Sequence, residues 1–163
     1  MNAVSNTTPL RYLIAIEREH LLGQLFEKVF VPTAVREELT DAKTPEIVRR
    51  RVLSLPAWFE VRTVAESRTT TFPATLHRGE REAILLAEAI QADVLLLDEQ
   101  IGRTIAMSRN LPLSGTLGVL ERADTLGLLN DFPQVLRQLK ASGFFIAASF
   151  EQQLLRRHLA RQR

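Results

Sequence analysis

The chain has 163 residues, of which 45% are hydrophobic and 25% charged, a composition that excludes a disordered, collagenous or low-complexity protein. The formal net charge is +2, which permits nucleic acid binding without favouring it. Cysteine is absent, so disulfides, thiol nucleophiles and thiolate zinc sites are excluded. The apolar runs are far shorter than the roughly 18 residues that span a bilayer. The N-terminus lacks the features of a signal peptide, so we expect no membrane partner and a cytoplasmic protein.

Strand and helix signals alternate along the chain. Short runs of apolar and β-branched residues predict strands over residues 3–5, 29–31, 58–61, 93–97 and 111–113. Early Pro or Thr residues predict helices over residues 32–39 and 44–53, and others that start at 9, 116 and 133. Helical patterning predicts two more, over residues 79–91 and 98–109. Residues 65–77 break the apolar pattern, which indicates a surface loop. This alternation favours an α/β fold with a parallel sheet covered by helices on both faces.

The last segment of the chain is an amphipathic, basic helix. Its apolar residues recur at helical spacing along one side, at Phe150, Leu154, Leu155 and Leu159. The helix either packs on its own domain with a solvated basic face, or contacts a partner, which includes RNA and a second copy of the chain. We therefore divide the chain into a domain of residues 1–148 and a helix of residues 149–163.

Two polar residues follow predicted strands at the edge where parallel sheets bind ligands. Asn6 comes after the first strand, and Asp98 closes the apolar run Val94–Leu97. Helix capping is an alternative explanation for either residue, because Asn and Asp are common caps. The two residues are therefore candidates for a site as well as for caps.

Glu80 shares one helical stripe with Ala83, Ile84 and Ala87, at offsets of three, four and seven residues. That stripe should be buried, and a buried carboxylate must be paired, protonated or bound to a metal. The alternative is a favourable placement in the first helical turn, where the helix dipole attracts an anion. We expect Glu80 to be more buried than its neighbour Glu82.

The same geometry separates the neighbours Glu37 and Glu38. Glu38 lies three residues from Val35 and four from Ala34, so it should face inward while Glu37 faces solvent. The alternative is that Glu38 is an exposed carboxylate at the helix end. By similar reasoning we expect Asp98, rather than Glu99, to face the site.

Together these residues predict a cluster of oxygen donors, made of Asn6, Glu38, Glu80 and Asp98. Oxygen ligands without nitrogen or sulfur suit Mg²⁺ or Mn²⁺. Such a site activates a bound water and neutralises charge on an attacked phosphate, so it needs no side-chain nucleophile.

Five short motifs carry a family resemblance, at residues 4–10, 31–39, 78–84, 97–103 and 115–120. In this order they resemble the PIN-domain superfamily (PilT N-terminus-like) of metal-dependent ribonucleases, and especially its PIN-like bacterial and archaeal branch. The resemblance covers roughly residues 3–150. It implies a three-layer α/β/α sandwich around a mainly parallel sheet, with Mg²⁺ or Mn²⁺ as cofactor.

The family's four acidic positions fall on Asn6, Glu38, Glu80 and Asp98. The first position departs from the family, because PIN nucleases usually have Asp where this chain has Asn6. An Asn supplies a carbonyl oxygen but no negative charge, which weakens metal binding.

The sequence leaves two functional hypotheses open. The first is an RNA-cleaving nuclease in which Glu38, Glu80 and Asp98 are catalytic and hold the metal, Asn6 completes the ligand set and Arg103 steadies phosphate. The resemblance also implies that such a protein is the toxin of a toxin–antitoxin pair, with a small antitoxin as partner. The second is a non-catalytic module that binds RNA or protein through a degraded metal site. The alternative for Arg103 is that it is a surface residue whose charge pairs with Asp98.

Overall fold

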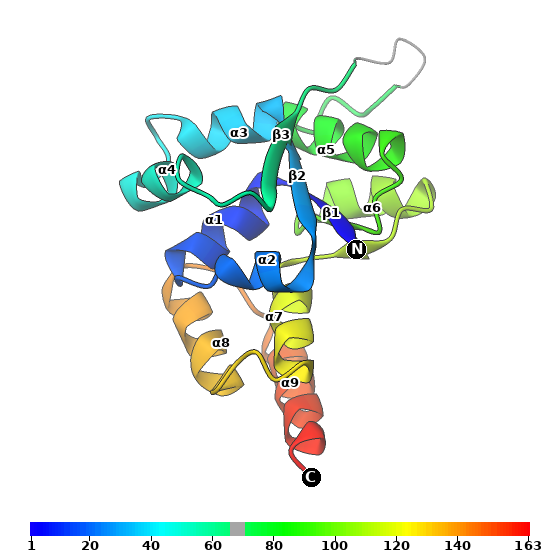
Figure 1. Cartoon of the computed structure of the whole chain (residues 1–163). Coiled ribbons are helices and arrows are strands. Elements are labelled where there is room, and N and C mark those ends of the chain that lie inside the picture. The colour runs from blue at the N-terminus through cyan, green and yellow to red at the C-terminus, as the bar shows by residue number, and fades with distance from the viewer. Residues whose placement is uncertain (66–70) are drawn as a thin grey trace.

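A parallel sheet lies at the centre of the structure, which is a computed structural model that describes residues 1–65 and 71–163. Within these ranges its five strands follow the order β3-β2-β1-β4-β5 (Figure 1). The strands are β1 (Asn2–Ser5), β2 (Lys28–Pro32), β3 (Phe59–Arg62), β4 (Val94–Leu96) and β5 (Leu113–Ser114). Chain order reverses beside β1, which pairs with β2 on one side and β4 on the other. In such sheets this reversal marks the place where ligands bind, at the carboxyl ends of the strands.

Helices cover both faces of the sheet (Figure 1). One face carries α1 (Thr7–Ala15), α2 (His20–Leu25), α3 (Thr33–Thr40), α4 (Glu46–Val52), α7 (Thr116–Thr125), α8 (Phe132–Ala141) and α9 (Ala148–Arg161). The other face carries α5 (Arg78–Ala89) and α6 (Gln100–Ser108). In the described parts of the chain, no helix is both long and apolar enough to cross a membrane.

The strands divide their side chains between two hydrophobic cores. In β2, Val29 and Val31 belong to the core under the larger helical layer, and Phe30 belongs to the core under α5 and α6. Within β4, Leu96 likewise belongs to the first of these cores and Leu95 to the second. Side chains of a strand point to opposite faces in turn, so a strand that is covered on both faces is apolar throughout. The α/β/α sandwich predicted from the sequence is therefore confirmed.

Two local predictions differ from the structure. The sequence predicts a first helix that starts at residue 9, but α1 begins at Thr7, and Asn6 holds the cap position with an extended backbone. The short helix α2 was not predicted. Within it, Leu21 and Leu22 are buried, but the helix has six residues and no side-chain cap. Its stability comes from packing, because so short a helix is marginal by itself.

The C-terminal helix α9 packs on α7. Leu154 is fully buried, and Arg161 forms an ion pair with the buried Asp124 of α7. The rest of the apolar stripe is less covered than expected, because 40% of Phe150 and 61% of Leu159 remain exposed. The helix therefore contacts its own domain, and its use by a second copy or by RNA stays a prediction.

Candidate functional site

The carboxyl ends of β1 and β4 bring two segments of the chain together. Asn6 directly follows β1, and Asp98 and Glu99 lie just after β4. The backbone N–H of Asn6 donates to the carbonyl oxygen of Leu96 at 3.0 Å, which joins the two strand ends. Parallel pairing puts these ends at one edge of the sheet, so residues 92 positions apart become neighbours.

Asn6 is 3% exposed and faces Glu99. Its amide Nδ2 donates to Glu99 Oε2 at 3.1 Å. Its carbonyl Oδ1 is buried and has no hydrogen-bond partner among the described residues. An unsatisfied buried acceptor costs about 1–3 kcal/mol, so this oxygen is a place where a cation or a donor group would be stabilised.

Glu80 is 5% exposed, and this burial confirms the expectation from its helical stripe. Its Oε2 accepts a hydrogen bond from the backbone N–H of His77 at 3.0 Å. Burial raises the pKa of Glu80, and the negative charges of Glu99 and Glu38 raise it further, against the opposing hydrogen bond from His77. Glu82 is more exposed than Glu80, as expected. The site therefore contains one buried carboxyl group that resists ionisation.

Glu38 is exposed, so the inward orientation predicted for it is wrong. It belongs to the last turn of α3, which ends at Thr40, and solvent reaches it there. The carboxylate nevertheless lies against the site's elements, because Oε2 accepts the hydroxyl of Thr7 at 2.5 Å. A Cβ atom at Gly79 would lie 2.5 Å from Glu38 Oε1. The absence of a side chain at Gly79 thus lets the carboxylate rest on the first turn of α5.

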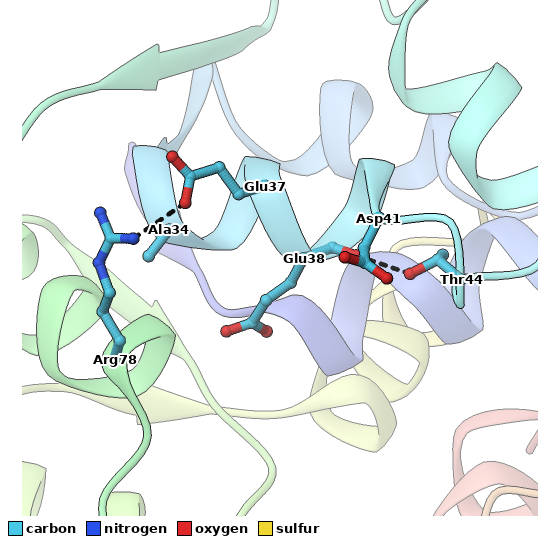
Figure 2. A pocket seen from close by; sticks show the side chains of 6 residues that line it. All are labelled: Ala34, Glu37, Glu38, Asp41, Thr44 and Arg78. Carbon is cyan, nitrogen blue, oxygen red and sulfur yellow. Dashed lines mark hydrogen bonds and ion pairs between the residues drawn. The ribbon is translucent and has the colours of Figure 1, made fainter.

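A cavity of about 410 Å³ opens beside Glu38 (Figure 2). It is lined by Ala34, Glu37, Glu38, Asp41, Thr44 and Arg78. Figure 2 shows the carboxylate of Glu37 meeting the guanidinium of Arg78, whereas the carboxylate of Glu38 lies apart from that guanidinium. Arg78 is neutralised by two carboxylates, Glu37 at 2.9 Å and Glu82 at 2.6 Å. The cavity therefore has a negative wall, which favours a cation.

Asp98 is held by two hydrogen bonds from the first residue of α7. Its Oδ1 accepts the backbone N–H of Thr116 at 3.0 Å, and its Oδ2 accepts the Thr116 hydroxyl at 2.6 Å. A Cβ atom at Gly115 would collide with Oδ1. Burial raises the pKa of Asp98, and the two hydrogen bonds from Thr116 oppose that rise. Both oxygens of Asp98 are thus used to hold the first turn of α7.

Glu99 takes the position beside Asn6 that was expected for Asp98. Besides the bond from Asn6, Glu99 accepts a hydrogen bond from the hydroxyl of Thr8. Asp98 and Glu99 are both half-buried, so the expected difference in their exposure is not seen. The sequence does contain the adjacent acids, but no pattern in it tells which of the two faces β1.

Arg103, predicted to steady phosphate, is a half-buried residue of α6. Its Nη1 donates to the carbonyl oxygen of Leu97 at 2.7 Å. Its positive charge is the smallest of the effects that oppose the burial-raised pKa of Asp98. Arg103 therefore holds the turn after β4, and contact with phosphate stays a prediction.

The structure thus gathers Asn6, Glu38, Glu80 and Glu99 around one sheet edge and places Asp98 against α7. Among residues 1–65 and 71–163, no group of three or more His, Asp or Glu side chains is arranged to hold one metal ion. The assignment of metal ligands therefore stays a prediction.

Comparisons with known proteins agree with this architecture. A family model described as a PIN domain matches residues 2–159. The chain is similar to a solved structure, a PilT N-terminus domain protein from the hyperthermophilic archaeon Sulfolobus solfataricus, with a TM-score of 0.55 and 17% sequence identity. The similarity covers 76% of this chain and 93% of that one, and at this identity it shows the fold alone. A search of curated proteins finds no match.

Proposed function

Because the chain belongs to the PIN-domain family, whose members are generally nucleases, we propose that it is a metal-dependent nuclease that cleaves RNA. The buried Oδ1 of Asn6, which has no partner in the described part of the chain, is the observation that carries this proposal. It lies beside Glu99 and at the edge that also holds Glu80 and Glu38. Hard cations bind oxygen ligands, so an unsatisfied oxygen among carboxylates favours their binding.

The residues fit Mg²⁺ or Mn²⁺ in their chemistry. The donors are oxygens alone, and Gly79 leaves room for the Glu38 carboxylate at the N-terminus of α5. Glu38, Glu80 and Asn6 would hold the ion, with Asp98 fixing the turn behind them. A bound ion of this kind lowers the pKa of a coordinated water and neutralises charge on the attacked phosphate.

The chain's own residues would orient the ligands of the ion. The His77 N–H donates to Oε2 of Glu80, which leaves Oε1 available to the ion. Thr7 orients Glu38 through its hydroxyl.

The test compares variants of two site carboxylates, one in α3 and one in α5, with a neighbouring carboxylate of α3 as control. We expect wild-type protein to cleave a mixed-sequence RNA with Mn²⁺ and to lose this activity with a chelator. Glu80→Gln and Glu38→Gln should reduce cleavage and weaken Mn²⁺ binding in calorimetric titration. Glu37→Gln is the matched control, because Glu37 pairs with Arg78, and it should leave both unchanged. Equal behaviour of the Glu37 and Glu38 variants would contradict the proposal.

A second function is favoured by a specific observation. Asn6 and Thr8 occupy both oxygens of Glu99, and Thr116 occupies both oxygens of Asp98. A site whose acids are held by protein donors without a cation also suits a non-catalytic module that binds RNA or a protein. RNA binding that persists in chelator, without metal-dependent cleavage, would support this alternative.

A role as the toxin of a toxin–antitoxin pair is a finer version of the nuclease proposal. It predicts that expression of the protein in the bacterial cytoplasm stops growth. The Glu80→Gln variant should then be harmless at the same expression level, and a small antitoxin protein should restore growth to the wild type. Equal growth arrest by the wild type and by Glu80→Gln would refute the idea that toxicity comes from nuclease activity.

A further inference from the structure

Glu99 is a carboxylate that neither the helical patterns nor the family positions assign to the site. In the structure both of its oxygens are directed at the segment after β1. Asn6 Nδ2 donates to Oε2 at 3.1 Å, and the hydroxyl of Thr8 donates to Oε1. Its negative charge also reaches Glu80, whose pKa it raises.

The chemistry of residue 6 decides whether Glu99 is stable in this position. An Asn amide has two N–H donors and no charge, so it can hold a neighbouring carboxylate by a hydrogen bond. An Asp at the same position is an acceptor only, and it would place a second negative charge beside Glu99. Like charges at such a distance repel strongly in a half-buried place. The neutral residue and the extra acid therefore compensate each other.

A second observation points to a ligand beside this pair. The remaining oxygen of Asn6, Oδ1, is buried without a partner in the described residues, while the whole residue is 3% exposed. The amide group is thus satisfied on the side of Glu99 and unsatisfied at its other end. A residue that served only as a helix cap would use this oxygen for the cap, but α1 has no side-chain cap hydrogen bond.

We propose that Glu99 is a carboxylate of the metal site and that Asn6 and Thr8 position it, so that the site keeps its shape without a bound cation. Asn6 stands where the family has an acid, and its amide donates a hydrogen bond to Glu99. This bond stabilises the Glu99 carboxylate when no cation is bound. The inference deepens the proposed function by naming a further site residue. It rests on that function only for the identity of the ion, because the metal-free form can be measured without any cleavage.

The test measures thermal unfolding of the full chain in chelator and in Mn²⁺. Wild type should be stable in chelator, and Mn²⁺ should raise its Tm only modestly, by binding to the folded state. Asn6→Asp should lower the Tm in chelator by on the order of 5 °C, and Mn²⁺ should restore it. Adding Glu99→Gln to Asn6→Asp should remove most of the loss in chelator. Adding Asp98→Asn instead should not, because Asp98 faces Thr116.

The difference between chelator and Mn²⁺ within each variant is the quantity compared, so a general loss of stability in one variant does not affect the conclusion. If Asn6→Asp does not fold in chelator but folds in Mn²⁺, the proposal is supported. Equal Tm values for wild type and Asn6→Asp in chelator would overturn it, as would rescue by Asp98→Asn but not by Glu99→Gln. Absence of RNA cleavage in wild type would refute the nuclease and leave this result intact.

Discussion

Replacement of Gly79 by Ala separates the stability of the fold from the geometry of the site. Gly79 is the second residue of α5, and a Cβ atom there would lie 2.5 Å from Oε1 and 3.2 Å from Cδ of Glu38. Because ordinary contacts begin near 3.5 Å, the carboxylate would have to retreat by about 1 Å. The Thr7 hydroxyl, now 2.5 Å from Oε2, would then lose its hydrogen bond.

The two effects on stability nearly cancel. The lost hydrogen bond costs about 1 kcal/mol, and Ala in a helix is favoured over Gly by up to about 1 kcal/mol. We therefore expect the Tm to change by less than about 4 °C. Displacement of an orienting partner of a ligand typically weakens metal affinity by about 10-fold to 100-fold. The variant should thus fold normally and bind Mn²⁺ at least about 10-fold more weakly.

The assay combines thermal unfolding with calorimetric titration of Mn²⁺. Gly118→Ala is the matched control, because Gly118 is also helical and its added Cβ would meet a flexible side chain, that of Ser114. The control should keep the wild-type affinity. Unchanged Mn²⁺ affinity in Gly79→Ala, with normal folding, would refute the idea that α5 holds Glu38 in the site.

Three further predictions follow from single side chains. Burial raises the pKa of Glu80 above 4.5, so its contribution to stability is fully present below pH 4.5 and is lost as the pH rises through the raised value. Without metal, Glu80→Gln should therefore gain stability relative to wild type between pH 4 and 7, measured by urea unfolding, and a constant difference would contradict this. Asp98→Ala should lower the free energy of unfolding by about 2–3 kcal/mol, because it removes both hydrogen bonds from Thr116. Asp98→Asn should lower it less, and equal losses in denaturant titrations would argue against a stabilising role of these bonds. Gly23→Ala should cost about 1–3 kcal/mol, because its Cβ would lie 2.6 Å from Nε1 of the rigid Trp58 indole, and a rise in Tm would disprove this.

Local patterns were enough to predict the architecture. The central part of β2, Val29–Val31, is apolar at every position because both faces are covered, and helices such as α5 repeat apolar residues at the helical period. The burial of Glu80 could be predicted for the same reason, since Ala83, Ile84 and Ala87 fix the orientation of its stripe from within one helix. A periodic signal depends only on neighbours in sequence, so it can be read without the tertiary structure.

The choice between Asp98 and Glu99 depended on the tertiary structure. The two acids are adjacent after a strand, and both types suit a site or a cap. Thr116, 18 residues away, draws Asp98 toward α7, and Asn6, 93 residues away in the other direction, holds Glu99. These partners meet the acids only because β1, β4 and β5 pair in parallel and end together at one edge of the sheet.

The exposure of Glu38 was decided in the same way. Its spacing from Ala34 and Val35 placed it on the inner stripe of α3, and both of those residues are indeed buried. Glu38 lies one turn further on, where its side chain is exposed and its carboxylate contacts Thr7 and lies against Gly79. The sequence by itself determined the period and the buried face of each main element. Only the tertiary structure decided how far along an element its inner face is covered, because the covering residues come from other segments of the chain.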